Sequence, residues 1–164
     1  MPDTIRRREF LKKSSALVLA GSLASTELAR GDDPAAHTGL LAGAAEVDVS
    51  PPKLPVLASG GFLERTGTEL HDHLFARGLV LDDGQKRLAI VVVDTLMMPR
   101  EMLDEVKRQA AASTGIPVES ILISATHTHT APSVMGALGT GVDEDYAAFL
   151  PGKLVECIEQ AAET

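Results

Sequence analysis

The sequence between Leu88 and Ser124 constrains the fold most, because it reads as a strand, a helix and a second strand in immediate succession. The first strand, Leu88 to Thr95, begins with Leu-Ala-Ile-Val-Val-Val, and an apolar run without a break predicts burial on both faces of a sheet. Pro99 stands at a favoured first-turn position of the helix, and Gly115 closes its apolar stripe. Because strands joined through a helix pair in parallel with a right-handed crossover, residues 88 to 95 are predicted to lie beside residues 120 to 125.

Two further strands are predicted before this unit. Residues 74 to 81 form a hairpin with the strand from Leu88, because Asp82-Asp83-Gly84 between them is a standard turn signal. Residues 44 to 49 alternate enough to form a short strand, which Ser50-Pro51-Pro52 stops because proline has no N–H for a ladder. The sequence therefore predicts an α/β fold with a mixed sheet, a β-hairpin, a right-handed crossover and flanking helices.

Two remaining segments complete this expected fold. Residues 54 to 68 contain one proline and three glycines, which predict a long loop with tight turns. Long loops in compact domains are often functional. Asp143 is predicted to cap a last helix that runs to about Ala162 and bends near Pro151-Gly152.

The first thirty residues have the form of an export signal. Arg7-Arg8-Glu9-Phe10-Leu11-Lys12 reads as a twin-arginine motif, and the apolar run Ala16 to Ala24 follows it with small residues suited to cleavage. This run is shorter than the about 20 residues that cross a bilayer. We therefore expect residues 1–30 to be a twin-arginine signal peptide, residues 31–41 to be a flexible leader, and the mature protein to be periplasmic or extracellular.

Charge and cysteine content exclude two classes of function. Without residues 1–30 the chain loses six Lys or Arg and three Asp or Glu, so its formal net charge changes from -8 to -11. Such an acidic chain is not expected to bind nucleic acid. The single Cys157 cannot form an internal disulfide, and its place in an apolar helical stripe predicts a small buried side chain rather than a catalytic thiol.

Two histidines one residue apart, His127 and His129, carry the strongest functional signal. In an extended chain they project from the same face, roughly 6.5 Å apart. Neutral imidazole is the commonest metal-ligating side chain, and catalytic zinc typically takes three protein ligands plus a water. The pair would therefore supply part of a metal or substrate site. Unrelated metallohydrolases also use a His-x-His pattern, and a structural role for either histidine stays open.

Several other side chains are weaker candidates. Asp94 ends a predicted strand at the edge where ligands bind in parallel sheets, and it could bind metal, orient a histidine or cap the next turn. His71-Asp72-His73 is a second His-x-His, although its place between a loop and a strand favours turn or edge roles. Arg77 is expected in solvent at a sheet edge unless it pairs with an acidic group. Ser133 lacks the glycine context of a nucleophile.

Together these segments resemble the N-terminal region of the neutral/alkaline, non-lysosomal ceramidases. The resemblance covers residues 42–164, and its most specific element is the Thr-His-Thr-His sequence followed by a proline. The matching segments are Ala42-Gly43-Ala44 to Val49-Ser50-Pro51-Pro52, Gly60-Gly61-Phe62, His71-Asp72 with Ala76-Arg77, Val93-Asp94, and Ser124-Ala125-Thr126-His127-Thr128-His129 with Pro132.

The resemblance implies a zinc-dependent hydrolase that splits an N-acyl amide, such as ceramide, into a fatty acid and an amine. It implies that His127 is a Zn2+ ligand and that His129 is a catalytic residue that also contacts the lipid amide substrate. Further candidates for positions next to these two histidines are Asp94, His71 and Arg77. In the family a second zinc histidine, a glutamate and a tyrosine come from regions after the part matched here, so the chain is expected to be a partial domain. A peripheral contact with a membrane surface is compatible with such a substrate.

The sequence departs from the family where Gly-Pro-Gly-Gly is replaced by Ala131-Pro132-Ser133-Val134, so the backbone there is expected to have a different shape. Two alternatives remain beside the ceramidase interpretation. One is another His-x-His metallohydrolase of the cyclase-amidase type, which would draw further ligands from His71 and His73. The other is an exported binding module without catalysis.

Overall fold

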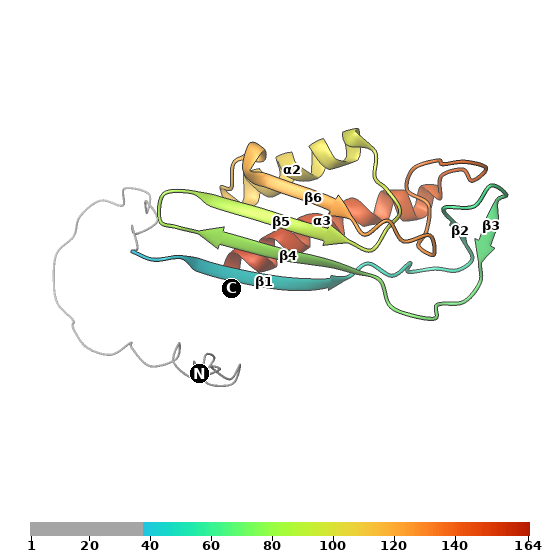
Figure 1. Cartoon of the computed structure of the whole chain (residues 1–164), viewed down its shortest axis with the longest axis horizontal. Coiled ribbons are helices and arrows are strands. Elements are labelled where there is room, and N and C mark those ends of the chain that lie inside the picture. The colour runs from blue at the N-terminus through green and yellow to red at the C-terminus, as the bar shows by residue number, and fades with distance from the viewer. Residues whose placement is uncertain (1–37) are drawn as a thin grey trace, which may run out of the picture. The chain divides into compact units, whose positions relative to one another are not determined.

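The structure, a computed structural model, describes residues 38–164 and contains one four-stranded sheet, one two-stranded sheet and two long helices (Figure 1). The elements in chain order are β1 (Leu41–Asp48), β2 (Val56–Ala58), β3 (Arg65–Gly67), β4 (Phe75–Asp82), β5 (Arg87–Val93), α2 (Arg100–Thr114), a single 3-10 turn (Val118–Ser120), β6 (Ile121–Ala125) and α3 (Glu144–Glu163). The predicted α/β class is confirmed.

The four-stranded sheet has the order β1-β4-β5-β6. β1 pairs antiparallel with β4, and β4 pairs antiparallel with β5 as the predicted hairpin. β5 and β6 pair in parallel, with Val91 opposite Ile123, and α2 connects them. The crossover predicted from the strand, helix and strand order is therefore present, and it brings the carboxyl ends of β5 and β6 together.

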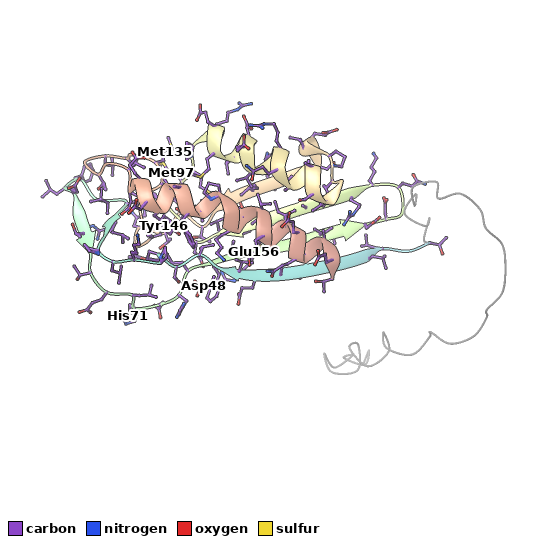
Figure 2. All side chains as sticks on the ribbon, turned by 180° about the vertical axis from the view of Figure 1, so that it is seen from behind. Asp48, His71, Met97, Met135, Tyr146 and Glu156 are labelled. Atoms are coloured by element: carbon purple, nitrogen blue, oxygen red, sulfur yellow. The ribbon has the colours of Figure 1, made fainter. Side chains whose placement is uncertain are left out.

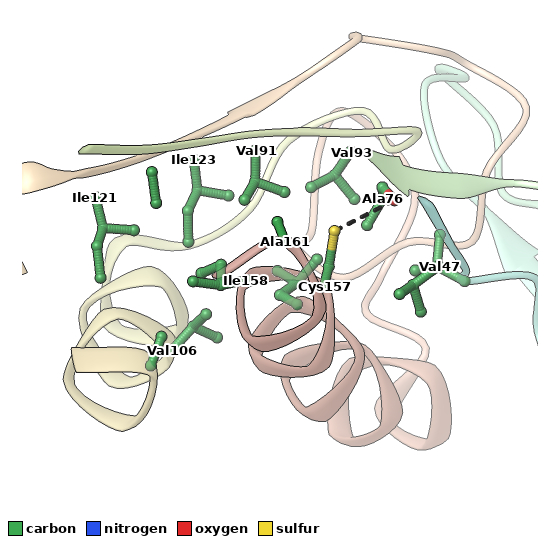
Figure 3. Close-up of a cluster of buried hydrophobic side chains, with 14 of the residues drawn as sticks. Val47, Ala76, Val91, Val93, Val106, Ile121, Ile123, Cys157, Ile158 and Ala161 are labelled. Atoms are coloured by element: carbon green, nitrogen blue, oxygen red, sulfur yellow. Dashed lines mark hydrogen bonds between the residues drawn. The ribbon is translucent and has the colours of Figure 1, made fainter. Parts of the chain in front are cut away.

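Both helices pack on the same side of this sheet, and the core lies between them and the strands (Figure 3). Side chains that alternate along each strand point to opposite faces, so every second residue of the sheet enters this core. The buried residues include Val47, Val80, Val91, Val93 and Ile123 from the sheet, Val106 and Ala110 from α2, and Leu150, Leu154 and Ile158 from α3.

The expectation that residues 88 to 95 are buried on both faces is wrong for the part of the chain that the structure describes. Leu88 and Val92 are 39% and 38% exposed, and Leu122 on the neighbouring strand is 54% exposed. Burial on both faces requires helices on both sides of the sheet, whereas α2 and α3 cover one side. The apolar side chains of the opposite face therefore lie open.

Both long helices begin and end where their boundary residues predict. Pro99 precedes the first turn of α2, and Gly115 ends it in the left-handed conformation, φ 72°, with its N–H donating to the Ala111 carbonyl. The Asp143 side chain accepts from the Tyr146 N–H at 3.1 Å and so caps α3. α3 runs unbroken through Pro151, and the bend expected there stays a prediction.

The expectation that residues 54–68 form one long loop is wrong, because they contain the antiparallel pair β2 and β3. The strands are three residues long, which is too short for a periodic pattern to reveal. An isolated bridge also joins Ala58 of β2 to Pro132, far along the chain. This second contact makes the β2–β3 hairpin part of the region around the two histidines.

The N-terminal boundary differs from the predicted one by a few residues. β1 begins at Leu41, so it starts before residue 44 and includes the last residue of the expected leader. The predicted signal peptide, residues 1–30, and the leader up to residue 37 lie outside the described residues. Among residues 38–164, no helix combines the length and the apolar composition needed to cross a membrane.

Cys157 lies buried on α3 against β4, as its position in an apolar stripe predicts (Figure 3). Its Sγ donates to the Ala76 carbonyl at 3.4 Å, and a Cβ added at Gly78 would lie 2.9 Å from it. Burial, assisted by the charge of Glu156, raises the pKa of the Cys157 thiol to about 11. The reactive thiolate is therefore scarce near neutral pH.

We expect the folded chain to react with an aromatic disulfide reagent at about pH 8 at least about a hundredfold more slowly than the chain in urea. The unfolded chain is the matched control, because it contains the same single thiol in water. Equal rates in the two states would show that Cys157 is accessible.

Candidate metal and catalytic site

The candidate site lies beyond the carboxyl ends of β5 and β6. The Thr126 N–H donates to the Val93 carbonyl at 2.9 Å, and the His127 N–H donates to the Thr95 carbonyl at 3.0 Å. These two bonds continue the parallel pairing for two residues past the strands. Asp94 and the histidines therefore do fall at the edge of the sheet where ligands bind in folds of this type.

His127 does not continue β6 as an extended residue, contrary to the expectation for the pair. The strand ends at Ala125, and His127 has φ 65°, in the left-handed region that non-glycine residues rarely adopt. Such a conformation costs of the order of 1–3 kcal/mol and is found most often at functional sites. The turn aims the ring toward Leu96, whose carbonyl lies 2.9 Å from Nδ1.

That hydrogen bond fixes the form of the His127 ring. A carbonyl oxygen accepts but cannot donate, so the proton must be on Nδ1, and Nε2 carries the lone pair in the neutral ring. Metal-binding histidines usually donate their other N–H to a carbonyl or a carboxylate in this way. His127 therefore has the hydrogen-bonding arrangement of a metal ligand.

His129 has a matching arrangement one residue further on. Its Nδ1 lies 3.0 Å from the Gly60 carbonyl, and so its Nε2 is also the nitrogen with the lone pair. The ring centroids of His127 and His129 are 5.2 Å apart, and the ring planes meet at 88°. The structure thus brings the two rings together, as predicted, although by a turn and not by an extended strand.

Asp94 and Arg77 form an ion pair beside this edge. Asp94 Oδ2 accepts from the Phe75 N–H at 3.0 Å and from Arg77 Nη1 at 2.9 Å. Arg77 Nε also donates to Glu46 at 2.8 Å. The side chain is 49% exposed, but the default expectation of a sheet-edge arginine is wrong, because Arg77 pairs with two carboxylates and β4 is an inner strand. These carboxylates raise the pKa of Arg77, chiefly through the Asp94 bond. The contacts of Asp94 hold β4, and its link to the metal site stays a prediction.

The second pair of histidines does not form one metal-binding group with the first in the described part of the chain. His71 is on the loop between β3 and β4, with a 95% exposed side chain 2.9 Å from Asp72, whose hydrogen bond raises the pKa of His71 (Figure 2). His73 Nδ1 lies 2.6 Å from Asp48 Oδ2. Hydrogen bonds from Ser50 and then from His73 lower the pKa of Asp48. Each histidine therefore has its own carboxylate partner in an exposed setting.

Ser133 is fully buried, and its hydroxyl donates to the Met135 carbonyl at 3.2 Å. Its backbone N–H donates to Leu57 and its carbonyl accepts from the Asp143 N–H at 2.7 Å. Because its hydroxyl, N–H and carbonyl are all hydrogen-bonded, Ser133 has a structural role, which agrees with the expectation that it is not a nucleophile. The segment that replaces the family's glycines is thus anchored to β2 and to the start of α3.

A groove of about 320 Å³ opens beside the histidine loop, with Thr130 and Pro132 among its lining residues. Its apolar lining comes from Leu54, Val56, Ala58, Leu70 and Leu74, and its polar lining includes Glu69, His71 and Asp72. An apolar surface with a few polar groups is the usual character of a small-molecule site.

Three contacts at this site were not expected from the sequence. Leu96 accepts from His127, Gly60 accepts from His129, and Arg65 Nη2 donates to the His129 carbonyl at 2.8 Å. The Gly60-Gly61 pair was the one available signal, because paired glycines mark places where backbone approaches another group closely. A backbone carbonyl and a loop arginine carry no comparable signal.

The residues fit part of a zinc site. Two neutral imidazoles with Nε2 lone pairs are suitable zinc ligands, and zinc in enzymes uses three protein ligands. Within the described part of the chain, no group of three His, Cys, Asp or Glu side chains is placed to hold a metal ion. The described residues therefore supply fewer donors than a complete site needs.

No family model and no curated protein matches the sequence. Solved structures that match the fold include neutral ceramidase from Pseudomonas aeruginosa, at 22% identity and a TM-score of 0.68, and a ceramidase complexed with C2, at 23% identity and a TM-score of 0.68. The chain shares its fold with part of these ceramidases. Each match covers 77% of this chain and 22% of the ceramidase chain, so the fold corresponds to about a fifth of a ceramidase. The resemblance inferred from the sequence is confirmed at the level of the fold.

Proposed function

We propose that this chain supplies part of the active site of a zinc-dependent hydrolase, which cleaves the N-acyl amide bond of ceramide or a related lipid to give a fatty acid and an amine. The observation that carries the proposal is the His127 ring, whose Nδ1 donates to Leu96 and whose Nε2 is left with its lone pair beside His129. The ceramidase fold around this pair supports the same reaction class.

His127 would hold the zinc ion through Nε2 in this proposal. Zinc bound in a hydrolase lowers the pKa of water to about 7 and polarises the carbonyl under attack. The contribution of this chain is to fix the ligand: the Leu96 carbonyl sets the tautomer of His127, and the strained backbone turn sets its position. A ligand held in this way binds metal without first having to be ordered.

His129 would exchange a proton with the substrate. Its Nδ1–H is used by the Gly60 carbonyl, so Nε2 is the nitrogen able to take up a proton and to donate it again. A protonated Nε2 can stabilise the developing oxyanion or protonate the leaving amine, because imidazole changes charge near neutral pH. The same nitrogen would bind the polar group of the substrate before reaction.

An apolar chain on the substrate agrees with the surroundings of the pair. The groove of about 320 Å³ next to Thr130 and Pro132 has apolar side chains that could hold part of an acyl chain, together with Glu69, His71 and Asp72. Phe62 and Leu63, in the loop between β2 and β3, are 84% and 81% exposed. These side chains support a peripheral contact with a membrane surface, from which a lipid amide would be drawn.

Export is part of the same proposal. The twin-arginine motif from Arg7 to Lys12 supports transport to the periplasm or beyond it, where a lipid hydrolase meets membrane surfaces and extracellular lipid. The cyclase-amidase alternative loses support, because within residues 38–164 no three His, Cys, Asp or Glu side chains are grouped to hold a metal ion, so His71 and His73 do not complete a site with His127. The alternative of a binding module would require a stable chain that neither binds zinc at His127 nor takes part in hydrolysis.

Zinc titration by calorimetry tests the proposal on the chain itself. Because the described residues provide fewer than three ligands, we expect zinc to bind more weakly than about 1 µM, and we expect no appreciable hydrolysis of ceramide by this chain alone. Magnesium is the control, since a hard cation has little affinity for imidazole. Stoichiometric zinc binding below about 1 µM would contradict this account of an incomplete site.

A further inference from the structure

The ring of His129 rests directly on the backbone of Gly60. Nδ1 lies 3.0 Å from the Gly60 carbonyl oxygen, and Gly60 has φ 89°, a conformation that side chains disfavour. A Cβ added at Gly60 would lie 2.4 Å from His129 Nδ1 and 2.7 Å from Cγ. The ring can occupy this place because residue 60 has no side chain.

Arg65 holds the same two segments from a second side. Its Nη2 donates to the Ser59 carbonyl at 3.0 Å and to the His129 carbonyl at 2.8 Å, so one guanidinium nitrogen joins the two segments. Next to it the Ser59 N–H and hydroxyl both bond the Ala131 carbonyl at 3.1 Å. The β2–β3 hairpin and the loop after β6 are therefore tied together at His129 and again at Ala131.

We infer that Gly60 and Arg65 are positioning residues that hold the His129 ring in place with its proton on Nδ1, so that the lone pair of the ring is on Nε2. The Gly60 carbonyl selects the tautomer, and the missing Cβ gives the ring its place. Arg65 fixes the backbone of His129 relative to that carbonyl. The catalytic meaning of this arrangement rests on the role proposed above for His129, whereas the arrangement itself does not.

Nitrogen-15 NMR of the histidine rings tests the inference without any activity assay. In the neutral ring the signals of the two nitrogens differ with the position of the proton, so spectra at alkaline pH report the tautomer. We expect His129 in the full chain to be protonated on Nδ1. In Gly60→Ala the ratio of the Nδ1–H to the Nε2–H tautomer should fall about five- to tenfold, because the bond to the carbonyl is lost.

Gly115→Ala is the matched control. Gly115 also has a positive φ, 72°, but a Cβ added there would meet nothing within 4 Å. Both substitutions therefore strain the backbone, and one of them also displaces the His129 ring. Gly115→Ala should leave the His129 tautomer as in the unaltered chain.

Arg65 variants test the second contact. Arg65→Met removes the donor and should shift the His129 ring signals in the direction of Gly60→Ala, whereas Arg65→Lys keeps a donor and should restore part of the original tautomer ratio. Arg100→Met, which removes an exposed arginine that pairs with Asp104 on α2, should change nothing at His129. If Gly60→Ala does not fold, the tautomer of His129 in the Arg65 variants tests the inference instead.

The inference is overturned if His129 in the unaltered chain is protonated on Nε2, or if its tautomer is the same in Gly60→Ala and Arg65→Met as in the controls. A different result would contradict the proposed function. Zinc that leaves His127 unchanged would remove the hydrolase assignment, while a tautomer set by Gly60 and Arg65 would still stand.

Discussion

Replacing Tyr146 with alanine is expected to lower the free energy of unfolding by about 3–5 kcal/mol. Tyr146 is 2% exposed in the first turn of α3, and its ring packs beside Phe149 with centroids 5.9 Å apart. Its hydroxyl donates to the Val49 carbonyl at 2.7 Å, which ties the helix to the residue that follows β1. Alanine removes the ring from the core and leaves a cavity, and it also leaves that buried carbonyl without its donor.

Urea unfolding of two matched variants separates these contributions. Tyr146→Phe keeps the ring and should cost about 1 kcal/mol, the value of one buried hydrogen bond. Leu122→Ala shortens a side chain that is 54% exposed and should change stability by no more than about 0.5 kcal/mol. A loss below about 1 kcal/mol for Tyr146→Ala would contradict the burial of this ring against the sheet.

The same hydroxyl gives the variants a distinct dependence on pH. Burial raises the pKa of Tyr146, and the negative charges of Asp48 and Asp94 raise it further. The folded chain then keeps its proton at pH values where the unfolded chain loses it, so stability falls as pH rises above about 10. Tyr146→Phe has no such proton to lose, and the difference in stability between it and the unaltered chain should shrink over that range.

The β4–β5 hairpin, the parallel pairing of β5 with β6 and both helices could be predicted from the sequence, because their signals are local, whereas the place of β1 beside β4 was not predicted. Gly115 and Asp143 mark helix ends through bonds within a few residues, and the strand, helix and strand order leaves one favoured pairing. The exposed face of β5 could not be predicted in the same way. Whether Val92 is covered depends on which side α2 and α3 occupy, and an apolar run does not encode that choice.

The site shows the same division between local and distant information. The His127 and His129 pair could be identified from its spacing, and so could its position after a parallel strand. The positive φ of His127 and the contact of His129 with Gly60 could not, because they depend on segments from elsewhere in the chain. Arg77 is similar: its partners Glu46 and Asp94 come from the two neighbouring strands, so its pairing follows from the sheet order and not from its own surroundings in the sequence.

Replacing His127 with alanine is expected to weaken zinc binding by the chain at least about a hundredfold, because even the loss of a group that only orients a zinc ligand costs 10- to 100-fold. His71→Ala is the matched control, since it removes an exposed imidazole paired with Asp72 and should leave zinc affinity unchanged. An equal loss in both variants would favour the cyclase-amidase alternative, which needs His71.

The ring nitrogens of His127, followed by nitrogen-15 NMR during a zinc titration of the full chain, give the most direct test of the proposed metal site. The Leu96 contact predicts that Nδ1 keeps its proton and that the Nε2 signal moves as zinc is added. Zinc that shifts the signals of His71 or His73 and leaves Nε2 of His127 unchanged would contradict the assignment of His127 as the zinc ligand.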